Sequence, residues 1–394
     1  SRTVPHSVVI VGAGVSGAIL AWRLATSGER LRVTLVERAP RLARGLAYST
    51  DNPLHVLNVP AGRMSALPED PDHFVRWLRE HGPASSAAGN AFVPRGLYGR
   101  YVADLLDSAG DAVERVHDEA VGIALRPGAD GASDAAGPAA RVSLASGRTL
   151  AADRVVLAMG NFPPVRTPGV PDALQDDPRV VRNPWAPGAL DALPAPGAES
   201  LPVLLLGTGL TMIDVALGIG GGSALRDSSG VTPLIALSRR GLLPQPHRAL
   251  EVPPAQHPAP PVQYWPEDAR GMLAAVRLYV RSCQQRGVDW REAITALRPV
   301  TARLWTSMPV PERRRFLEHL QPLWDTHRHR AAPQVWARVE DMLAQGTLRT
   351  MAGRVARVAP LGPRASDPLE VTIAPRAGGE PVTLRVARVI NCTG

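Results

Sequence analysis

Residues 7–26 constrain the fold of this chain most strongly. Residues 7–11 are a short apolar run rich in valine, which is typical of a buried parallel strand. Gly12, Gly14 and Gly17 follow with the spacing Gly-x-Gly-x-x-Gly, and a helix-like segment continues to about residue 26. In such a turn the glycines allow, in order, a tight bend, a close approach of pyrophosphate and packing of helix on strand. Because the helix N-terminus offers N–H groups to phosphates, the pattern predicts a dinucleotide site; the alternative is a glycine-rich turn without a ligand.

A similar pattern returns after residue 200. Residues 201–206 predict a strand, and Gly207 and Gly209 lead into a second helix-like segment. Met212 stands where the third glycine would be, so we expect this helix to lie slightly further from its strand. The sequence therefore predicts two nucleotide-binding units in tandem.

The next strand of each unit ends in residues of opposite charge. Glu37 follows residues 31–36 and lies 20 residues after Gly17, where a carboxylate accepts ribose hydroxyls. Residues 233–237 are followed instead by Arg239 and Arg240. Because a carboxylate repels a 2′-phosphate and arginine binds it, we expect FAD or NAD in the first unit and NADP in the second. The alternative for the two arginines is a solvated turn.

Composition excludes several other classes of protein. The 394 residues are enough for about two domains, and we find no apolar run long enough for a membrane span and no signal peptide. Cys283 and Cys392 are far apart in the sequence, which favours a reducing cytoplasm over a redox dithiol. The net charge of +8 comes from scattered arginines without any lysine, so we expect neither nucleic-acid binding nor Schiff-base chemistry.

The segment at residues 44–64 is irregular, because Gly45, Pro53, Pro60 and Gly62 interrupt both helical and strand periods. A long irregular segment directly after a cofactor-binding strand is typical of a binding loop. We interpret it as a wall of the cofactor's reactive ring; the alternative is a loop that supports the core.

The remaining segments complete two similar halves. In the first half we expect helices near residues 71–80 and 92–106, a hairpin formed by residues 112–126 and 140–150 with a solvated tip at 128–139, and a buried strand at 155–160. In the second half we expect a helical insertion at about 266–345, a hairpin formed by 346–357 and 369–373, and a closing strand at 389–394. The predicted fold is α/β, with two tandem Rossmann-like dinucleotide-binding domains at residues 1–168 and 169–394 and the helical insertion in the second.

The run from Asp325 to Arg330 lies in that insertion. On a helix His327 and His329 point apart, which disfavours a metal site. We therefore expect a polar face, or an anion or substrate contact, there.

The arrangement resembles the two-dinucleotide-domain flavoproteins, and within them it looks most like the FAD/NAD(P)-binding proteins of the YdhS-like group. The resemblance is carried by residues 12–17, 45–48, 55–64, 207–212, 238–241 and 324–330. The fingerprint of typical flavin monooxygenases is missing between residues 169 and 201. Such proteins also normally return to the FAD domain after the second strand-end glycine, here Gly394, so we expect either that this segment is missing or that the flavin site is completed differently.

The resemblance also implies roles for individual residues. Asn58 and His55 would lie near the flavin ring as the catalytic pair, and Arg63, Arg328 and Arg330 would bind a substrate carboxylate. FAD would be held by Gly12, Gly14, Ser16, Gly17, Glu37, Arg38, Gly45, Tyr48, Leu57, Met64, Val121 and Gly160, and NADPH by Gly207, Thr208, Gly209, Thr211, Ser238, Arg239 and Arg240.

The implied activity is an NADPH-dependent flavin monooxygenase that uses O₂ to N-hydroxylate a small amine or amino acid through a C4a-(hydro)peroxyflavin. Two alternatives stay open. One is a flavin-dependent NAD(P)H reductase or dehydrogenase with an acceptor other than oxygen, and the other is a non-catalytic FAD/NADPH sensor.

Overall fold

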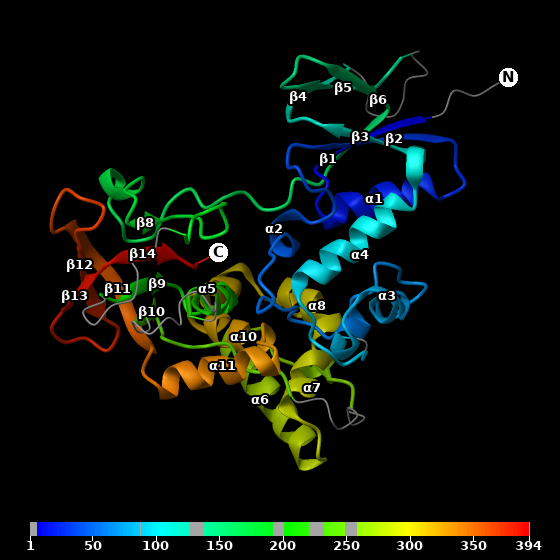
Figure 1. Cartoon of the computed structure of the whole chain (residues 1–394). Coiled ribbons are helices and arrows are strands. Elements are labelled where there is room, and N and C mark those ends of the chain that lie inside the picture. Colours follow the sequence, from blue (N-terminus) through cyan, green and yellow to red (C-terminus); the bar gives the residue numbers. More distant parts are fainter. Residues whose placement is uncertain are drawn as a thin grey trace. The chain divides into compact units, whose positions relative to one another are not determined.

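The computed structural model describes residues 6–86, 88–126, 137–191, 201–220, 232–248 and 258–393 (Figure 1). The chain divides into two compact units, Ser1–Pro163 and Pro164–Gly394. Each is an α/β unit built on parallel strands, which confirms the predicted fold class. Gly394 and most of the expected tip at 128–139 lie outside the described residues.

Unit 1 contains one parallel sheet and one small antiparallel sheet. The parallel sheet has the strand order β3-β2-β1-β7 and the antiparallel sheet the order β4-β5-β6. The elements are β1 (His6–Val11), α1 (Val15–Ala25), β2 (Leu31–Glu37), α2 (Gly45–Tyr48), α3 (His73–His81), α4 (Arg95–Asp107), β3 (Val113–His117), β4 (Ala120–Leu125), β5 (Ala140–Leu144), β6 (Thr149–Ala152) and β7 (Arg154–Leu157).

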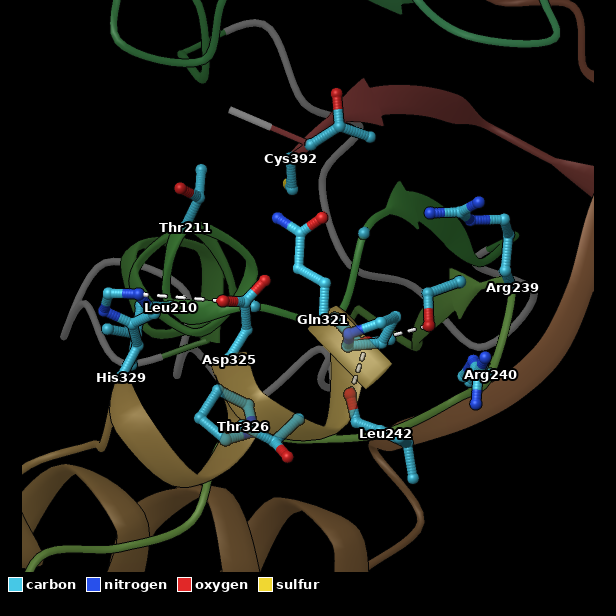
Figure 2. A pocket seen from close by; sticks show the side chains of 17 residues that line it. Leu210, Thr211, Arg239, Arg240, Leu242, Gln321, Asp325, Thr326, His329 and Cys392 are labelled. Carbon is cyan, nitrogen blue, oxygen red and sulfur yellow. Dashed lines mark hydrogen bonds and ion pairs between the residues drawn. The ribbon is translucent and has the colours of Figure 1, made fainter. Parts of the chain in front are cut away.

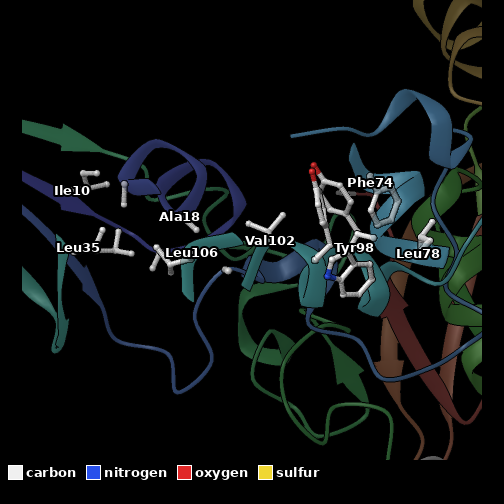
Figure 3. Packing of buried hydrophobic residues seen from close by; sticks show 14 of the residues in the cluster. Ile10, Ala18, Leu35, Phe74, Leu78, Tyr98, Val102 and Leu106 are labelled. Carbon is white, nitrogen blue, oxygen red and sulfur yellow. The ribbon is translucent and has the colours of Figure 1, made fainter. Parts of the chain in front are cut away.

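The core of unit 1 lies between its parallel sheet and its helices. Ile10 and Leu35 are paired on neighbouring strands and are at most 1% exposed, and they face Ala18 of α1 (Figure 3). The small alanine lets the helix lie close to the sheet. The core continues between α3 and α4, where the rings of Phe74 and Tyr98 meet edge-on at 5.1 Å. This packing holds the strand ends that carry the site.

Two expectations for unit 1 were wrong in detail. Residues 112–126 form two strands: β3 adds to the edge of the parallel sheet, and only β4 enters the antiparallel sheet. The backbone turns between them, where Asp118 N donates to Glu37 O. The strand expected to be buried at 155–160 is β7, which is half-exposed because, among the strands that the structure describes, it is an edge strand paired only with β1.

Unit 2 contains a seven-stranded sheet with the order β13-β12-β11-β10-β9-β14-β8. In this order, each pair of neighbouring strands from β11 to β8 is parallel. The pairs β11–β12 and β12–β13 are antiparallel. The elements are β8 (Val180–Val181), β9 (Val203–Leu206), α5 (Leu210–Gly220), β10 (Leu234–Ser238), α6 (Ala269–Gln285), α7 (Trp290–Ala296), α8 (Thr301–Ser307), α9 (Val310–Arg315), the π-helix η8 (Phe316–Leu320), α10 (Gln321–Arg328), α11 (Pro333–Ala344), β11 (Leu348–Pro360), β12 (Leu369–Pro375), β13 (Val382–Val386) and β14 (Arg388–Asn391).

The second unit matches the expected order of elements. The chain from α6 to α11 is a helical insertion between β10 and β11, and β11 and β12 form the expected hairpin. Within the part of the chain that the structure describes, no helix combines the length and apolarity needed to cross a membrane.

Candidate dinucleotide-binding sites

The first glycine turn joins β1 to α1, and packing requires two of its glycines. Gly12 has a φ of +101°, and a Cβ atom there would lie 2.3 Å from the carbonyl oxygen of Ala158. A Cβ atom on Gly17 would lie 1.9 Å from the carbonyl oxygen of Gly12. A side chain at either position would therefore force the turn away from the strand beside it or from its own helix.

Gly14 is not required by packing within the chain. It has a φ of −63°, and the atom nearest to a Cβ there would be Gly45 Cα at 3.6 Å. Gly14 is the N-cap of α1 and supplies no side chain to cap the helix. The first backbone N–H groups of α1 therefore face an open space beside Gly14, called the cradle below. An anionic ligand can occupy this space, and a Cβ atom on residue 14 would narrow it.

Glu37 stands at the end of β2 beside this turn. Its Oε2 accepts a hydrogen bond from Ala13 N at 2.7 Å, and its Oε1 accepts one from Ala39 N at 2.8 Å. These two bonds fix the carboxylate at the strand end. Each oxygen keeps a second lone pair, so the group can still accept a hydrogen bond from a ribose hydroxyl.

The segment after β2 returns to the glycine turn. Ala43 N donates to Ala13 O at 2.7 Å, and Ala43 has a φ of +64°, a conformation that is unusual for a residue with a side chain. Two residues later, a Cβ on Gly45 would lie 3.4 Å from Gly14 Cα. Gly45 thus lies against Gly14, and its contact with FAD stays a prediction.

The loop that follows holds His55 firmly. His55 is 7% exposed. Its Nδ1 lies 2.8 Å from Thr50 Oγ1, and its Nε2 lies 3.5 Å from Asn52 Nδ2. Because both ring nitrogens have partners within the loop, the geometry favours a supporting role for His55. Asn58 is half-buried in the same loop. The catalytic assignment of the two residues stays a prediction.

Three further residues of unit 1 surround the turn or its loop. Ser16 is exposed on the first turn of α1, and Gly160 has a φ of +68° with no atom within 4 Å of its Cβ position. Tyr48 is half-buried with its ring centroid 4.9 Å from that of Tyr98. Ser16 and Gly160 leave room for a ligand, and Tyr48 supports the loop that would contact the ligand.

The remaining predicted residues of unit 1 have other surroundings. Leu57 is buried and Met64 packs against the core, so both stabilise the loop. Arg38 forms an exposed ion pair with Glu119 at 3.0 Å. Val121 and Arg63 are exposed. Their assignment to cofactor or substrate stays a prediction.

The second glycine turn repeats the first. Gly207 has a φ of +111°, and a Cβ there would lie 2.6 Å from Cys392 O, just as a Cβ on Gly12 would meet Ala158 O. Cys392 thus occupies in unit 2 the position that Ala158 occupies in unit 1. Met212, in place of the third glycine, is fully buried. The wider spacing between helix and strand stays a prediction.

A cavity of about 630 Å³ opens at this second turn (Figure 2). Its sides come from the glycine turn, the end of β10, the end of β14 and one face of α10. It is lined by Gly207, Thr208, Gly209, Leu210, Thr211, Ser238, Arg239, Arg240, Leu242, Pro244, Gln321, Pro322, Asp325, Thr326, His329, Cys392 and Thr393. All the residues predicted to hold NADPH therefore line one cavity.

Hydrogen bonds hold the loop after β10 against the glycine turn. Thr208 Oγ1 donates to Leu242 O at 2.5 Å and lies 2.8 Å from Ser238 Oγ, which also accepts from Gly241 N at 2.9 Å. The hydroxyl groups of Thr208 and Ser238 thus position this side of the cavity.

The two arginines of this loop differ. Arg240 is half-buried and its Nη2 donates to Glu318 O at 3.3 Å. Arg239 is exposed and makes no hydrogen bond or ion pair among the described residues. Arg239 is therefore available for a phosphate, whereas Arg240 joins the loop to the helical insertion.

Three polar residues of α10 and its C-cap line the cavity: Gln321, Asp325 and His329. Asp325 and His329 belong to the run singled out in the sequence, whereas Gln321 was not expected there. Asp325 Oδ1 lies 3.9 Å from His329 Nε2. Burial raises the pKa of Asp325, and the nearby His329 and a hydrogen bond from Gln321 partly oppose that shift. The i, i+4, i+8 spacing of the three residues was the signal that they share one face of the helix.

The arginines predicted from the same run do not line this cavity. Arg328 is half-buried, and burial and the neighbouring Arg298 lower its pKa. Arg330 is 7% exposed and its Nη2 donates to Thr295 Oγ1 at 2.7 Å. The structure therefore does not bring Arg328 and Arg330 together with the nucleotide residues, and their role in substrate binding stays a prediction.

Comparisons with known proteins agree with the α/β fold described above. Residues 9–162 match the family model described as FAD-NAD(P)-binding. The ornithine N-hydroxylase of Kutzneria sp. 744, solved with reduced FAD, NADP⁺ and L-ornithine, is 18% identical over 99% of this chain and 80% of its own, with a TM-score of 0.59. A comparison with curated proteins finds no match.

Two other solved structures have the same fold. The ornithine hydroxylase of Pseudomonas aeruginosa is 16% identical over 99% of this chain and 82% of its own, with a TM-score of 0.61. The cadaverine monooxygenase of Erwinia amylovora is 12% identical over 98% of this chain and 77% of its own, with a TM-score of 0.58. The chain has the fold of the two-dinucleotide-domain flavoproteins.

Proposed function

We propose that this protein is an FAD- and NADPH-dependent monooxygenase that N-hydroxylates a small amine or amino acid with O₂. One observation carries the proposal: a single chain holds two dinucleotide turns, with Glu37 at the first and an unpaired Arg239 at the second. The opposite charges suit one cofactor without a phosphate on the ribose 2′ position and one cofactor with it. The similar structures that act on ornithine and cadaverine support the choice of an amine.

The residues of the first turn fit FAD. The uncapped N-terminus of α1 and the cradle beside Gly14 suit the pyrophosphate, and Glu37 has free lone pairs for the adenosine ribose. Asn58, in the loop after β2, is our proposed contact to the reactive ring, and Arg63 would bind a substrate carboxylate.

The residues of the second turn fit NADPH. Gly207 and Gly209 leave the backbone open to the pyrophosphate, and Arg239 would bind the 2′-phosphate. Gln321, across the cavity on α10, would orient the rest of the nucleotide through its polar side chain.

Bound FAD supplies the electron and oxygen chemistry, so the protein needs no catalytic triad of its own. The work of this chain is to bind both nucleotides, orient the amine and exclude water. We assign residues 1–168 to the FAD domain and residues 169–394 to the NADPH domain, and we place the chain in the YdhS-like group in the cytoplasm.

Anaerobic reduction followed by oxygen tests the proposal. The protein reconstituted with FAD is mixed with NADPH, and then with aerated buffer containing ornithine, lysine or cadaverine. We expect the flavin absorbance to bleach with NADPH, and mass spectrometry to find an amine that has gained one oxygen atom.

Two results would contradict the proposal. Flavin reduction with all electrons recovered as hydrogen peroxide, for every amine, would favour a reductase. Failure to bind FAD or to oxidise NADPH would favour a sensor.

A further inference from the structure

The helical insertion of unit 2 contains a second cavity, of about 520 Å³. It lies among α6, α7, η8 and α10 and shares no lining residue with the nucleotide cavity. Its volume is within the usual range for sites that bind small molecules. The two cavities use different residues of α10, because Gln321 and Asp325 line the first while Leu323 and Trp324 line the second.

The wall of this second cavity is mostly apolar. Met272 and Ile294 are almost fully buried, and the others are half-buried, so they present their apolar surface to the cavity. The apolar lining residues are Met272, Leu273, Val276, Val280, Trp290, Ile294, Phe316, Leu320, Leu323 and Trp324. Such a wall favours a ligand with an apolar body.

The charged side chains that line the cavity, within the described ranges of the chain, are all cationic. Arg277 and Arg281 lie one helical turn apart on α6, are exposed, and have no ion pair or hydrogen bond to any residue that the structure describes. Among the lining residues that the structure describes, none is an aspartate or a glutamate. Unpaired guanidinium groups beside an apolar wall select a carboxylate, which arginine can bind with two parallel hydrogen bonds.

Nearby acidic residues do not neutralise these arginines. Glu292 is paired with Arg248 at 2.6 Å, and Asp289 is paired with Arg291 at 3.2 Å. Arg277 and Arg281 therefore keep no carboxylate partner among the residues that the structure describes.

One polar side chain has a fixed orientation in the wall. His327 Nδ1 lies 2.8 Å from Leu323 O, so it carries the proton and donates it to that carbonyl. Its Nε2 is then the acceptor nitrogen, and its ring meets that of Trp290 nearly edge-on at 5.2 Å. A ligand donor group can bond to this nitrogen.

We propose that this cavity is a binding site for a small carboxylate with an apolar body, with Arg277 and Arg281 holding the carboxylate and the wall of Val276, Val280 and Trp324 enclosing the body. The site is separate from the nucleotide cavity and does not depend on the proposed monooxygenase activity.

Octanoate is the probe, with octylamine and octanol as ligands of equal chain length and different charge. Because Trp290 and Trp324 line the cavity, occupation is followed by tryptophan fluorescence, and affinity is measured by calorimetry on the full chain. We expect octanoate to bind at least about tenfold more tightly than octanol or octylamine, as charge-assisted hydrogen bonds would give.

Variants locate the site. Arg277→Gln/Arg281→Gln should weaken the binding of octanoate about tenfold or more, because it removes both charge-assisted contacts. Arg270→Gln/Arg286→Gln, which removes the same charge from the ends of the same helix outside the cavity, should leave the affinity unchanged. Val276→Trp, which fills the apolar wall but keeps both arginines, should also prevent binding.

Three results would overturn the proposal. They are equal affinities for the acid, the alcohol and the amine, an equal loss in the two arginine double variants, and no detectable binding of octanoate by the wild-type chain.

Discussion

Arg239 and Arg240 are adjacent in the loop after β10, but only Arg240 is held in place, because its Nη2 donates to Glu318 O at 3.3 Å. Arg239 is exposed and has no partner among the residues that the structure describes. One arginine is thus free for a ligand, and the other joins the loop to η8.

We therefore predict that Arg239→Gln reduces the preference for NADPH over NADH. Loss of one charge-assisted hydrogen bond costs about 1.5–3 kcal/mol, so the ratio of the two kcat/KM values should fall roughly tenfold to a hundredfold. The matched variant Arg240→Gln should change kcat/KM for NADPH and for NADH by the same factor. A greater loss of preference in Arg240→Gln would reverse the assignment.

The difference between these arginines shows why the sequence predicts the fold better than the site. The glycine turns, Glu37 and the arginine pair follow from local patterns, because strand, turn and helix are defined by neighbouring residues. The partner of Arg240 lies 78 positions away, and only the folded insertion brings Glu318 to it.

The same reason explains the missed and misplaced residues of α10. The sequence showed a polar run at residues 325–330 but not which side of the helix faces the cavity. The structure selects Asp325 and His329 and leaves Arg330 buried beside Thr295. Similarly, β3 was expected in a hairpin because a strand pattern does not reveal which neighbour it pairs with.

Gly14 and Gly17 should respond differently to the same substitution. Gly17→Ala places a Cβ 1.9 Å from Gly12 O, so we predict loss of about 3 kcal/mol or more of folding stability in unit 1, as for severe overpacking. Gly14→Ala has 3.6 Å to its nearest atom and should fold normally but bind FAD at least about tenfold more weakly, because its Cβ enters the pyrophosphate cradle.

Thermal unfolding and titration with FAD separate the two effects. A Gly14→Ala variant with normal FAD affinity would exclude this turn as the pyrophosphate site. A Gly17→Ala variant with normal stability would contradict the close packing of α1 on the turn.

Asp325 should oppose the binding of NADPH. Its carboxylate lines the nucleotide cavity, and burial raises its pKa above the ordinary value of 3.8, with His329 and Gln321 opposing the shift. Protonation as the pH falls through this raised pKa removes a negative charge that repels the phosphates, so NADPH should bind more tightly at acidic pH. Asp325→Asn should mimic this at neutral pH with a gain of up to about fivefold, the size of an exposed charge interaction.

Calorimetric titration with NADPH across the acid range checks this prediction. The variant should lose the part of the pH dependence that comes from Asp325. Weaker binding by Asp325→Asn at neutral pH would show instead that the carboxylate accepts a hydrogen bond from the nucleotide.

Asp177 and Arg179 form a buried ion pair that anchors β8 to the loop between β11 and β12. Arg179 Nη2 donates to Asp177 Oδ2 at 2.7 Å, and Arg179 Nη1 donates to Gly362 O at 3.0 Å. The side chain of Arg179 is 4% exposed and that of Asp177 is 13% exposed. Asp177→Asn leaves the guanidinium without its counter-charge. We predict a loss of about 3–5 kcal/mol in the free energy of unfolding at neutral pH.

The neighbouring residue is the control for this last prediction, because Asp176 forms its ion pair with Arg182 at 3.1 Å while 87% exposed. Asp176→Asn should change the unfolding free energy by no more than about 0.5 kcal/mol. The hydrogen bonds from Arg179 lower the pKa of Asp177 below 3.8, so its stabilisation is present above that value and is lost as the pH falls through the lowered pKa. The difference between wild type and Asp177→Asn, measured by urea unfolding, should therefore be constant near neutrality and shrink below about pH 4. Equal effects of the two variants would show that burial does not strengthen the Asp177 pair.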